Sequence, residues 1–191
     1  MDVPPAVPAW AAGFVAKQAI ASSRSLRSRY PSRMSRGEEL AHRFREAYLP
    51  VLAFIESADD RTWLTFIPAE EAAVGAVMNH VAQSMRYNGA VLKAFRLGNP
   101  PVQLTQEMID AFNQTEKAEA TEPSRSEILE AMRTGVDRVA ASLEAIPDEA
   151  FASQTPIDVG DHIAENLEQW TVEITTPHGL DHLETCRSAL G

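Results

Sequence analysis

The chain has 191 residues, of which 45% are hydrophobic and 23% are charged, and these proportions suit one soluble globular domain with a single core. Its formal net charge of −10 argues against a general nucleic-acid binder, which normally presents a basic surface. No apolar run reaches the roughly 18 residues of a membrane span, and the single cysteine, Cys186, cannot form an internal disulfide. We therefore expect a cytoplasmic protein with neither a nucleic-acid nor a membrane partner.

The charge is unevenly distributed along the chain. Residues 1–33 carry a net +4, so the rest of the chain carries −14. This first stretch is rich in Ser, Ala and Pro, and three interpretations are open for it: a disordered tail, a transit-like leader, or a non-native extension that precedes Met34. In each case the folded domain is expected to span residues 34–191.

From residue 36 onward, apolar residues recur at three- and four-residue steps, which predicts amphipathic helices. Pro50 should kink the first helix or split off its last turn. Glu70 and Glu71 should favour the first turn of the second helix. Ser124 and Glu127 form a capping box at the start of the third long helix. The expected ranges are about 36–57, 69–97, 105–119, 124–146 and 158–189. No strand-like alternation of useful length occurs. The pattern predicts an all-α, antiparallel four-helix bundle with a longer crossover, residues 98–123, between helices 2 and 3.

Three histidines are the candidate metal ligands. His178 and His182 are one helical turn apart and continue the apolar stripe of the last helix, so their imidazoles should project from the same side. His80 lies in the middle of the buried face of the second helix. Three protein ligands leave a coordination position open to water or substrate, which is typical of a reactive metal site.

Several loose motifs, in this order and spacing, resemble the DinB family (the YfiT-like or mycothiol-dependent maleylpyruvate isomerase-like superfamily). They are the run Met-Ser-Arg-Gly-Glu-Glu-Leu at residues 34–40, Trp63, and the segments 77–82, 110–113, 143–149 and 178–190. Together they cover nearly the whole domain. The resemblance implies a four-helix bundle that holds a divalent metal through one histidine of the second helix and two ligands of the last, here His80, His178 and His182.

The same resemblance implies a function. Characterised relatives include thiol-dependent isomerases and S-transferases, so we expect a divalent metal (zinc, nickel or iron), mycothiol, bacillithiol or another small thiol as co-substrate, and a small electrophilic substrate. A homodimer is also implied. Two alternatives stay open: a non-catalytic helical module that binds metal or ligand, and a metal-dependent hydrolase.

Four further residues lie near the candidate ligands in the sequence. Cys186 is about 12 Å along the helix axis from His178, too far to share one ion, and is expected to pack as a small core residue. Glu165 and Glu168 could accept a hydrogen bond from a ligand imidazole, although a solvated acidic face is the preferred interpretation. Pro177 removes a backbone donor next to His178 and should bend the helix, with the pair either misaligned or aimed by the bend.

Overall fold

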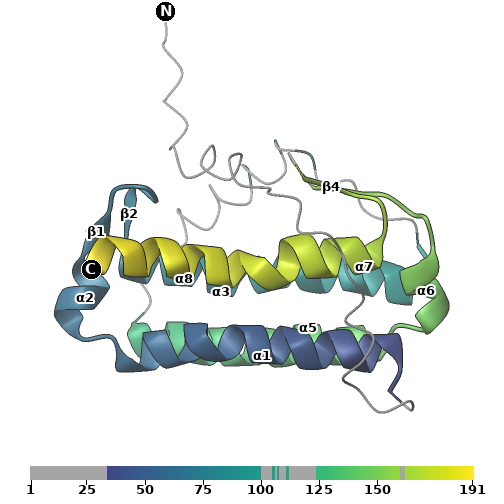
Figure 1. The fold of residues 1–191 in the computed structure, drawn as a ribbon, viewed down its shortest axis with the longest axis horizontal. Helices are drawn as coiled ribbons and strands as arrows, with labels where there is room; N and C mark the ends of the chain where they lie inside the picture. Colours follow the sequence, from purple (N-terminus) through teal and green to yellow (C-terminus); the bar gives the residue numbers. More distant parts are fainter. Residues whose placement is uncertain (1–33, 100–104, 106, 108–110, 112–123, 160–161) are drawn as a thin grey trace, which may run out of the picture.

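In the computed structural model of the chain, the residues described are 34–99, 105, 107, 111, 124–159 and 162–191. They are mostly helical, as the sequence predicts, and four long helices lie in two layers (Figure 1). One layer holds α3 (Val74–Arg96) and α8 (Thr176–Leu190), and the other holds α1 (Arg36–Ser57) and α5 (Arg125–Glu144). Both α1 and α3 contact α5 and α8, and the space between the helices is filled by one apolar core.

Contacts at the helix ends define the directions of the helices. The Arg125 guanidinium at the start of α5 donates to the carbonyl of Ala58, just beyond the end of α1. The backbone N–H of Arg36 at the start of α1 donates to Asp148 Oδ1, beyond the end of α5, at 2.9 Å, so these two helices are antiparallel. α3 begins at the same end as α5, because it packs on the short helix that follows α1. α3 and α5 therefore run in the same direction, so the end of α3 and the start of α5 lie at opposite ends of the helices.

Short elements join the long helices. In chain order they are α2 (Asp60–Leu64), β1 (Phe66–Ile67), β2 (Ala72–Ala73), α6 (Asp148–Ala152), β3 (Ile157–Val159), β4 (His162–Ala164), α7 (Leu167–Gln169) and the π-helix η3 (Trp170–Thr175). β1 pairs antiparallel with β2, and β3 pairs antiparallel with β4. The sequence analysis predicted neither hairpin, because strands of two and three residues are too short to display an alternating pattern.

The predicted starts of two long helices are wrong. α3 begins at Val74 and not at residue 69, because residues 66–73 form the β1–β2 hairpin and Glu71 adopts a left-handed backbone with φ of 50°. The last helical segment begins at Leu167 and not at residue 158, where β3 and β4 intervene. Ile163, which lies within the predicted range of that helix, is instead 73% exposed in β4. The predicted helix over 105–119 lies outside the described residues, apart from three isolated positions.

The predicted ranges of the first and third long helices are confirmed, whereas Pro50 does not split off the last turn of the first. α1 spans the predicted range and continues through Pro50 undivided. The capping box of Ser124 and Glu127 begins α5, and Ser35 with Glu38 forms a second capping box at the start of α1. In each box the serine oxygen accepts from a backbone N–H that the helix itself cannot satisfy.

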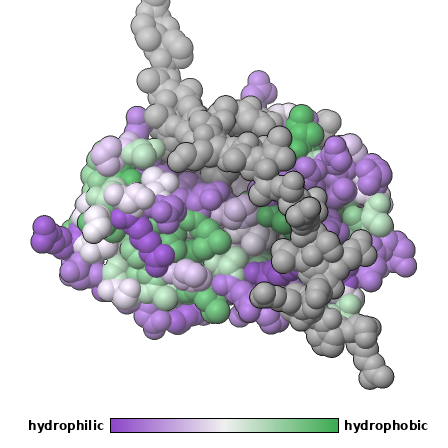
Figure 2. Space-filling view, in the orientation of Figure 1, coloured by the Kyte–Doolittle hydropathy of each residue, from purple (hydrophilic) through white to green (hydrophobic). Residues whose placement is uncertain are grey.

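Figure 2 shows one face of the molecule. On this face hydrophilic side chains are widespread, and hydrophobic ones gather over a limited area. None of the helices in the described ranges has the length and apolar character required to cross a bilayer.

Gly37 permits the close approach of α1 and α5. A Cβ at Gly37 would lie 2.3 Å from the carbonyl oxygen of Leu143, and backbone of this kind cannot rotate away. We predict that Gly37→Ala lowers the free energy of unfolding by at least about 2 kcal/mol, measured by urea denaturation. Gly89→Ala is the matched control, because nothing lies within 4 Å of a Cβ there, and it should be neutral or stabilising by about 0.5–1 kcal/mol. Equal stability of the two variants would contradict this packing.

Candidate metal centre

The fold brings the three predicted ligands together. His80 projects from α3, while His178 and His182 project from successive turns of α8. Their ring centroids are 4.7–5.4 Å apart, and every pair of rings is close to perpendicular. One ligand nitrogen from each ring lies within 4.8 Å of the other two. Residues almost a hundred positions apart in the sequence therefore form one cluster that could hold a metal ion.

The donor set of this cluster suits a divalent cation of the first transition row. Imidazole nitrogens bind such ions at 2.0–2.1 Å, which places two nitrogens of a tetrahedral site about 3.3 Å apart. No separation between the ligand nitrogens exceeds 4.8 Å, so each pair is within about 1.5 Å of the spacing that one shared ion requires.

Glu70 belongs to the centre, although the sequence analysis placed it at a helix start. Its Oε1 lies 2.9 Å from Nδ1 of His182, and both side chains are buried, with relative exposures of 8% and 7% for the two residues. A carboxylate on Nδ1 stabilises the tautomer that carries its proton there, which leaves Nε2 as the coordinating atom. Glu70 therefore orients the imidazole of His182 in the way that carboxylates orient metal-ligating histidines.

The turn of the β1–β2 hairpin carries Glu70 into the site. The N–H of Glu70 donates to the carbonyl of Ile67 at 3.0 Å, and β1 packs against α8. Glu71, the next residue, has a φ of 50°, a conformation that is uncommon for a residue with a side chain. Strained backbone of this kind persists only where surrounding contacts require it, and here it reverses the chain immediately after the carboxylate.

A π-helical turn before α8 accommodates Pro177. The N–H of Thr176 donates to the carbonyl of Thr171, five residues earlier, and its hydroxyl donates to the same oxygen at 2.6 Å. Pro177 consequently stands in the first turn of α8, where a missing N–H costs little. The two histidine rings lie 4.7 Å apart, so the proline does not separate the ligand pair.

Tyr48 of α1 sets the position of this junction. Its ring is fully buried, and its hydroxyl donates to the carbonyl of Thr175 at 3.3 Å. Burial raises the pKa of Tyr48 well above its usual range, so the hydroxyl keeps its proton and remains a donor. Gly179 lies against the ring, and a Cβ there would be 2.6 Å from a ring carbon. A glycine beside His178 therefore permits α8 to pack closely on α1.

The environment keeps His80 in the form that binds metals. Desolvation of its imidazole, followed by the influence of His182, lowers the pKa of His80 to about 4, while Glu70 acts in the opposite direction. The ring is therefore neutral at physiological pH, and a neutral imidazole has a lone pair to offer to a cation.

The other candidates lie outside the cluster. Cys186 is fully buried in the apolar core, as expected, and burial raises the pKa of its thiol to about 12, which leaves it unreactive. Glu168 forms an ion pair with Arg36, and the N–H of Glu165 donates to Gln169 at 2.7 Å. Neither acid contacts a histidine in any interaction the structure records, so Glu70 takes the role that was considered for them.

No family model, no curated protein and no solved structure matches this chain. The DinB resemblance therefore stays a prediction from the motifs, and the geometry of the histidine cluster stands independently of it.

The lowered pKa of His80 predicts a pH dependence of stability in metal-free protein. Below pH of about 6.5, the unfolded chain takes up a proton on His80 and the folded chain does not, down to pH of about 4. The free energy of unfolding should therefore fall as the pH decreases from 7.5 to 5, with about 1–2 kcal/mol of this loss due to His80. In urea titrations at each pH, His80→Gln should remove this loss of free energy of unfolding. His42→Gln, at an exposed histidine beside Glu46, should show the same loss as the wild type. Parallel pH profiles for the wild type and His80→Gln would contradict the assignment.

Proposed function

We propose that this chain is a divalent-metal protein of the DinB type that acts as a thiol-dependent S-transferase or isomerase on a small electrophile. The observation that carries the proposal is the convergence of His80, His178 and His182 within 4.8 Å. Imidazole ligands suit zinc, nickel, iron and copper, and three nitrogens alone do not choose among these ions.

The hydrogen bond from Glu70 supports a metal-binding role for the cluster over a structural one. A neutral core histidine needs one acceptor and one donor for its two ring nitrogens, which does not require three imidazoles and a carboxylate in one cluster. Three imidazoles with a buried carboxylate on one of them match the arrangement of metal ligands and their supporting acceptor. The donor set therefore fits a cation better than it fits an apolar core.

The number of protein ligands supports a reactive centre. His80 and His178 are partly exposed as residues and His182 is buried, while Nε2 of His178 and of His182 are enclosed. Structural zinc sites are usually closed by four protein ligands, whereas catalytic sites retain an open position. Three nitrogen ligands would leave the fourth position of a tetrahedral site for a thiol or a water.

A bound divalent ion would supply a Lewis acid that lowers the pKa of a thiol or water. The residues of the chain contribute orientation and protection. Glu70 holds the proton on Nδ1 of His182, Tyr48 and Thr175 position α8, and the apolar core behind the rings limits the access of water. In the proposed transfer, the thiol gives its proton to solvent, its sulfur attacks an electrophilic carbon and forms a carbon–sulfur bond, and the leaving group departs as an anion with the electrons of its broken bond.

The overall architecture is part of the same proposal. We interpret α1, α3, α5 and α8 as the four-helix bundle of the DinB type, which is supported by their pairwise contacts and by the ligands on the second and last long helices. The predicted homodimer and cytoplasmic location derive from the resemblance and from composition, and they stay predictions.

Metal content tests the site directly. We predict about one equivalent of zinc, nickel or iron in purified protein, measured by elemental analysis after dialysis, because three ligands of one ion act together. His80→Ala and the double variant His178→Ala/His182→Ala should each lose the metal while they retain helical circular dichroism. His42→Ala, at an exposed histidine of α1, is the matched control and should retain it. No bound metal in the wild type after incubation with each ion would overturn the proposal.

Thiol chemistry is tested on the loaded protein. An aryl halide that releases a measurable product should react faster with mycothiol, bacillithiol or another small thiol when the metal-loaded wild type is present. Rates with His80→Ala should equal those without protein. Metal binding without thiol-dependent turnover would leave the site intact and reject the transferase assignment.

Glu70 should tune the affinity for metal without being a ligand. We predict that Glu70→Gln weakens zinc binding about 10- to 100-fold in competition titrations with a chromogenic chelator, because the amide cannot accept the His182 proton as strongly. Glu184→Gln removes the same charge from an exposed position on α8, two residues from His182, and should change the affinity less than about twofold. Equal effects of the two substitutions would indicate a general electrostatic contribution only.

A further inference from the structure

A groove between α3 and α5 is separate from the histidine cluster. It encloses about 420 Å³, and its floor includes Met85 and Gly89 of α3. At 100° per residue, Gly89 lies about 180° around α3 from His80 and about 13 Å along its axis. The groove therefore opens on the opposite side of α3, and its contents cannot contact the histidines.

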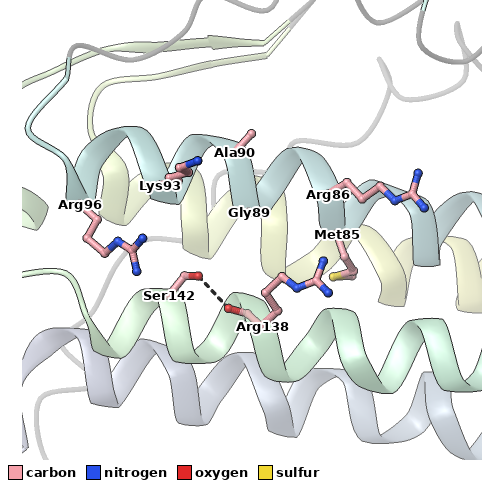
Figure 3. A pocket seen from close by; sticks show the side chains of 8 residues that line it. All are labelled: Met85, Arg86, Gly89, Ala90, Lys93, Arg96, Arg138 and Ser142. Atoms are coloured by element: carbon pink, nitrogen blue, oxygen red, sulfur yellow. Dashed lines mark hydrogen bonds between the residues drawn. The ribbon is translucent and has the colours of Figure 1, made fainter.

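Four cationic residues line this groove: Arg86, Lys93, Arg96 and Arg138. In Figure 3, Arg96 extends from α3 toward α5 at one end of the groove, and the guanidinium of Arg138 extends from α5 toward Met85 farther along it, with Ser142 between them. None of the four forms an ion pair with a carboxylate in the part of the chain that the structure describes. Arginines elsewhere do form them, as Arg45 does with Glu144 at 2.6 Å.

The charge of α3 contrasts with the rest of the chain. Its 23 residues include three cationic side chains and no Asp or Glu, whereas the whole chain has a net charge of −10. Lys93 and Arg96 in the last turn would stabilise the carboxyl end of the helix dipole. That explanation does not extend to Arg86 or Arg138, which lie well before the last turns of their helices, where the dipole has little effect.

We propose that this groove binds a small organic phosphate. Guanidinium groups donate paired hydrogen bonds to phosphate oxygens, and three arginines with one lysine along the groove provide such donors and positive charge. The volume suits a small molecule, and the side chain of Met85 with the bare backbone of Gly89 offers an apolar surface for its organic part. The hydroxyl of Ser142 already donates to the carbonyl of Arg138 at 2.8 Å, so the cations provide the specific contacts.

Phenyl phosphate is the probe that tests this site. Amide chemical shifts of the full-length, isotope-labelled protein are followed during titration in metal-free, low-salt buffer, which keeps the histidine cluster out of the measurement. We expect saturable shifts confined to α3 and α5, with half-saturation below about 5 mM and weaker binding as salt increases. His80→Ala should bind the probe as the wild type does, so failure of the metal proposal would not affect this result.

Two double substitutions that each remove two positive charges distinguish a specific phosphate site from a general electrostatic attraction of anions. Arg96→Gln/Arg138→Gln should weaken phenyl phosphate binding at least about tenfold, since two charge-assisted contacts are lost. Arg45→Gln/Arg133→Gln removes two arginines that pair with Glu144 and Glu56, and should change binding less than about twofold. Gly89→Phe should abolish binding by filling the groove, because nothing lies within 4 Å of a Cβ there.

Three outcomes would overturn the proposal. The first is no saturable shift at any concentration of phenyl phosphate up to 20-fold above the expected half-saturation. The second is equal weakening by the two double substitutions, which would indicate only a general attraction of anions. The third is loss of binding in His80→Ala, which would place the phosphate at the histidine cluster. In every variant, circular dichroism confirms that the helices are retained.

Discussion

Thr175 holds the last helical segment against two neighbouring helices at once. Its carbonyl accepts from Tyr48 of α1 at 3.3 Å, and its hydroxyl donates to Oδ1 of Asn88 of α3 at 3.4 Å. Each bond is long, but Thr175 is buried, and in a low-dielectric core such bonds gain strength and any loss is costly. His178 and His182 follow three and seven residues later on the same helix. A rotation of α8 by one residue, about 100°, would turn both imidazoles away from His80, so the histidine cluster depends on this junction.

The π-helical turn solves a conflict that the sequence creates. The helix must deliver two histidines to α3, yet Pro177 cannot donate to the carbonyl ladder beside them. Hydrogen bonding over five residues in η3 makes Pro177 an early residue of α8. The backbone N–H and the hydroxyl of Thr176 both donate to the carbonyl of Thr171. Short π segments occur frequently at functional sites. Because of this wider turn, α8 begins in the orientation that brings His178 beside His80 of α3.

The sequence predicted the parts of the site that obey helical periodicity. His178 and His182 were found because residues four apart share a helix face, and His80 because apolar residues surround it on the inner face of its helix. Glu70 was assigned wrongly because two adjacent acids after Pro68 are typical of a helix start. Its true position depends on the left-handed backbone of Glu71, which no local pattern of side chains predicts. The β3–β4 hairpin was not predicted for a different reason. Each of its strands has three residues, which are too few for an alternating pattern to be visible.

Charge counting at the histidine cluster bears on which co-ligand the site would favour. Three neutral imidazoles and one carboxylate contribute −1 when Glu70 is ionised, so a divalent ion would leave a net charge of +1. A partly buried net charge is unfavourable unless an anion compensates it, and Glu70 is the acid that hydrogen-bonds a histidine of the cluster. A thiolate or another anionic ligand at the open position would bring the sum to zero, whereas a neutral water would not. The carboxylate of Glu70 thus does more than orient His182, since it sets the charge that makes one anionic ligand the best complement to a divalent ion.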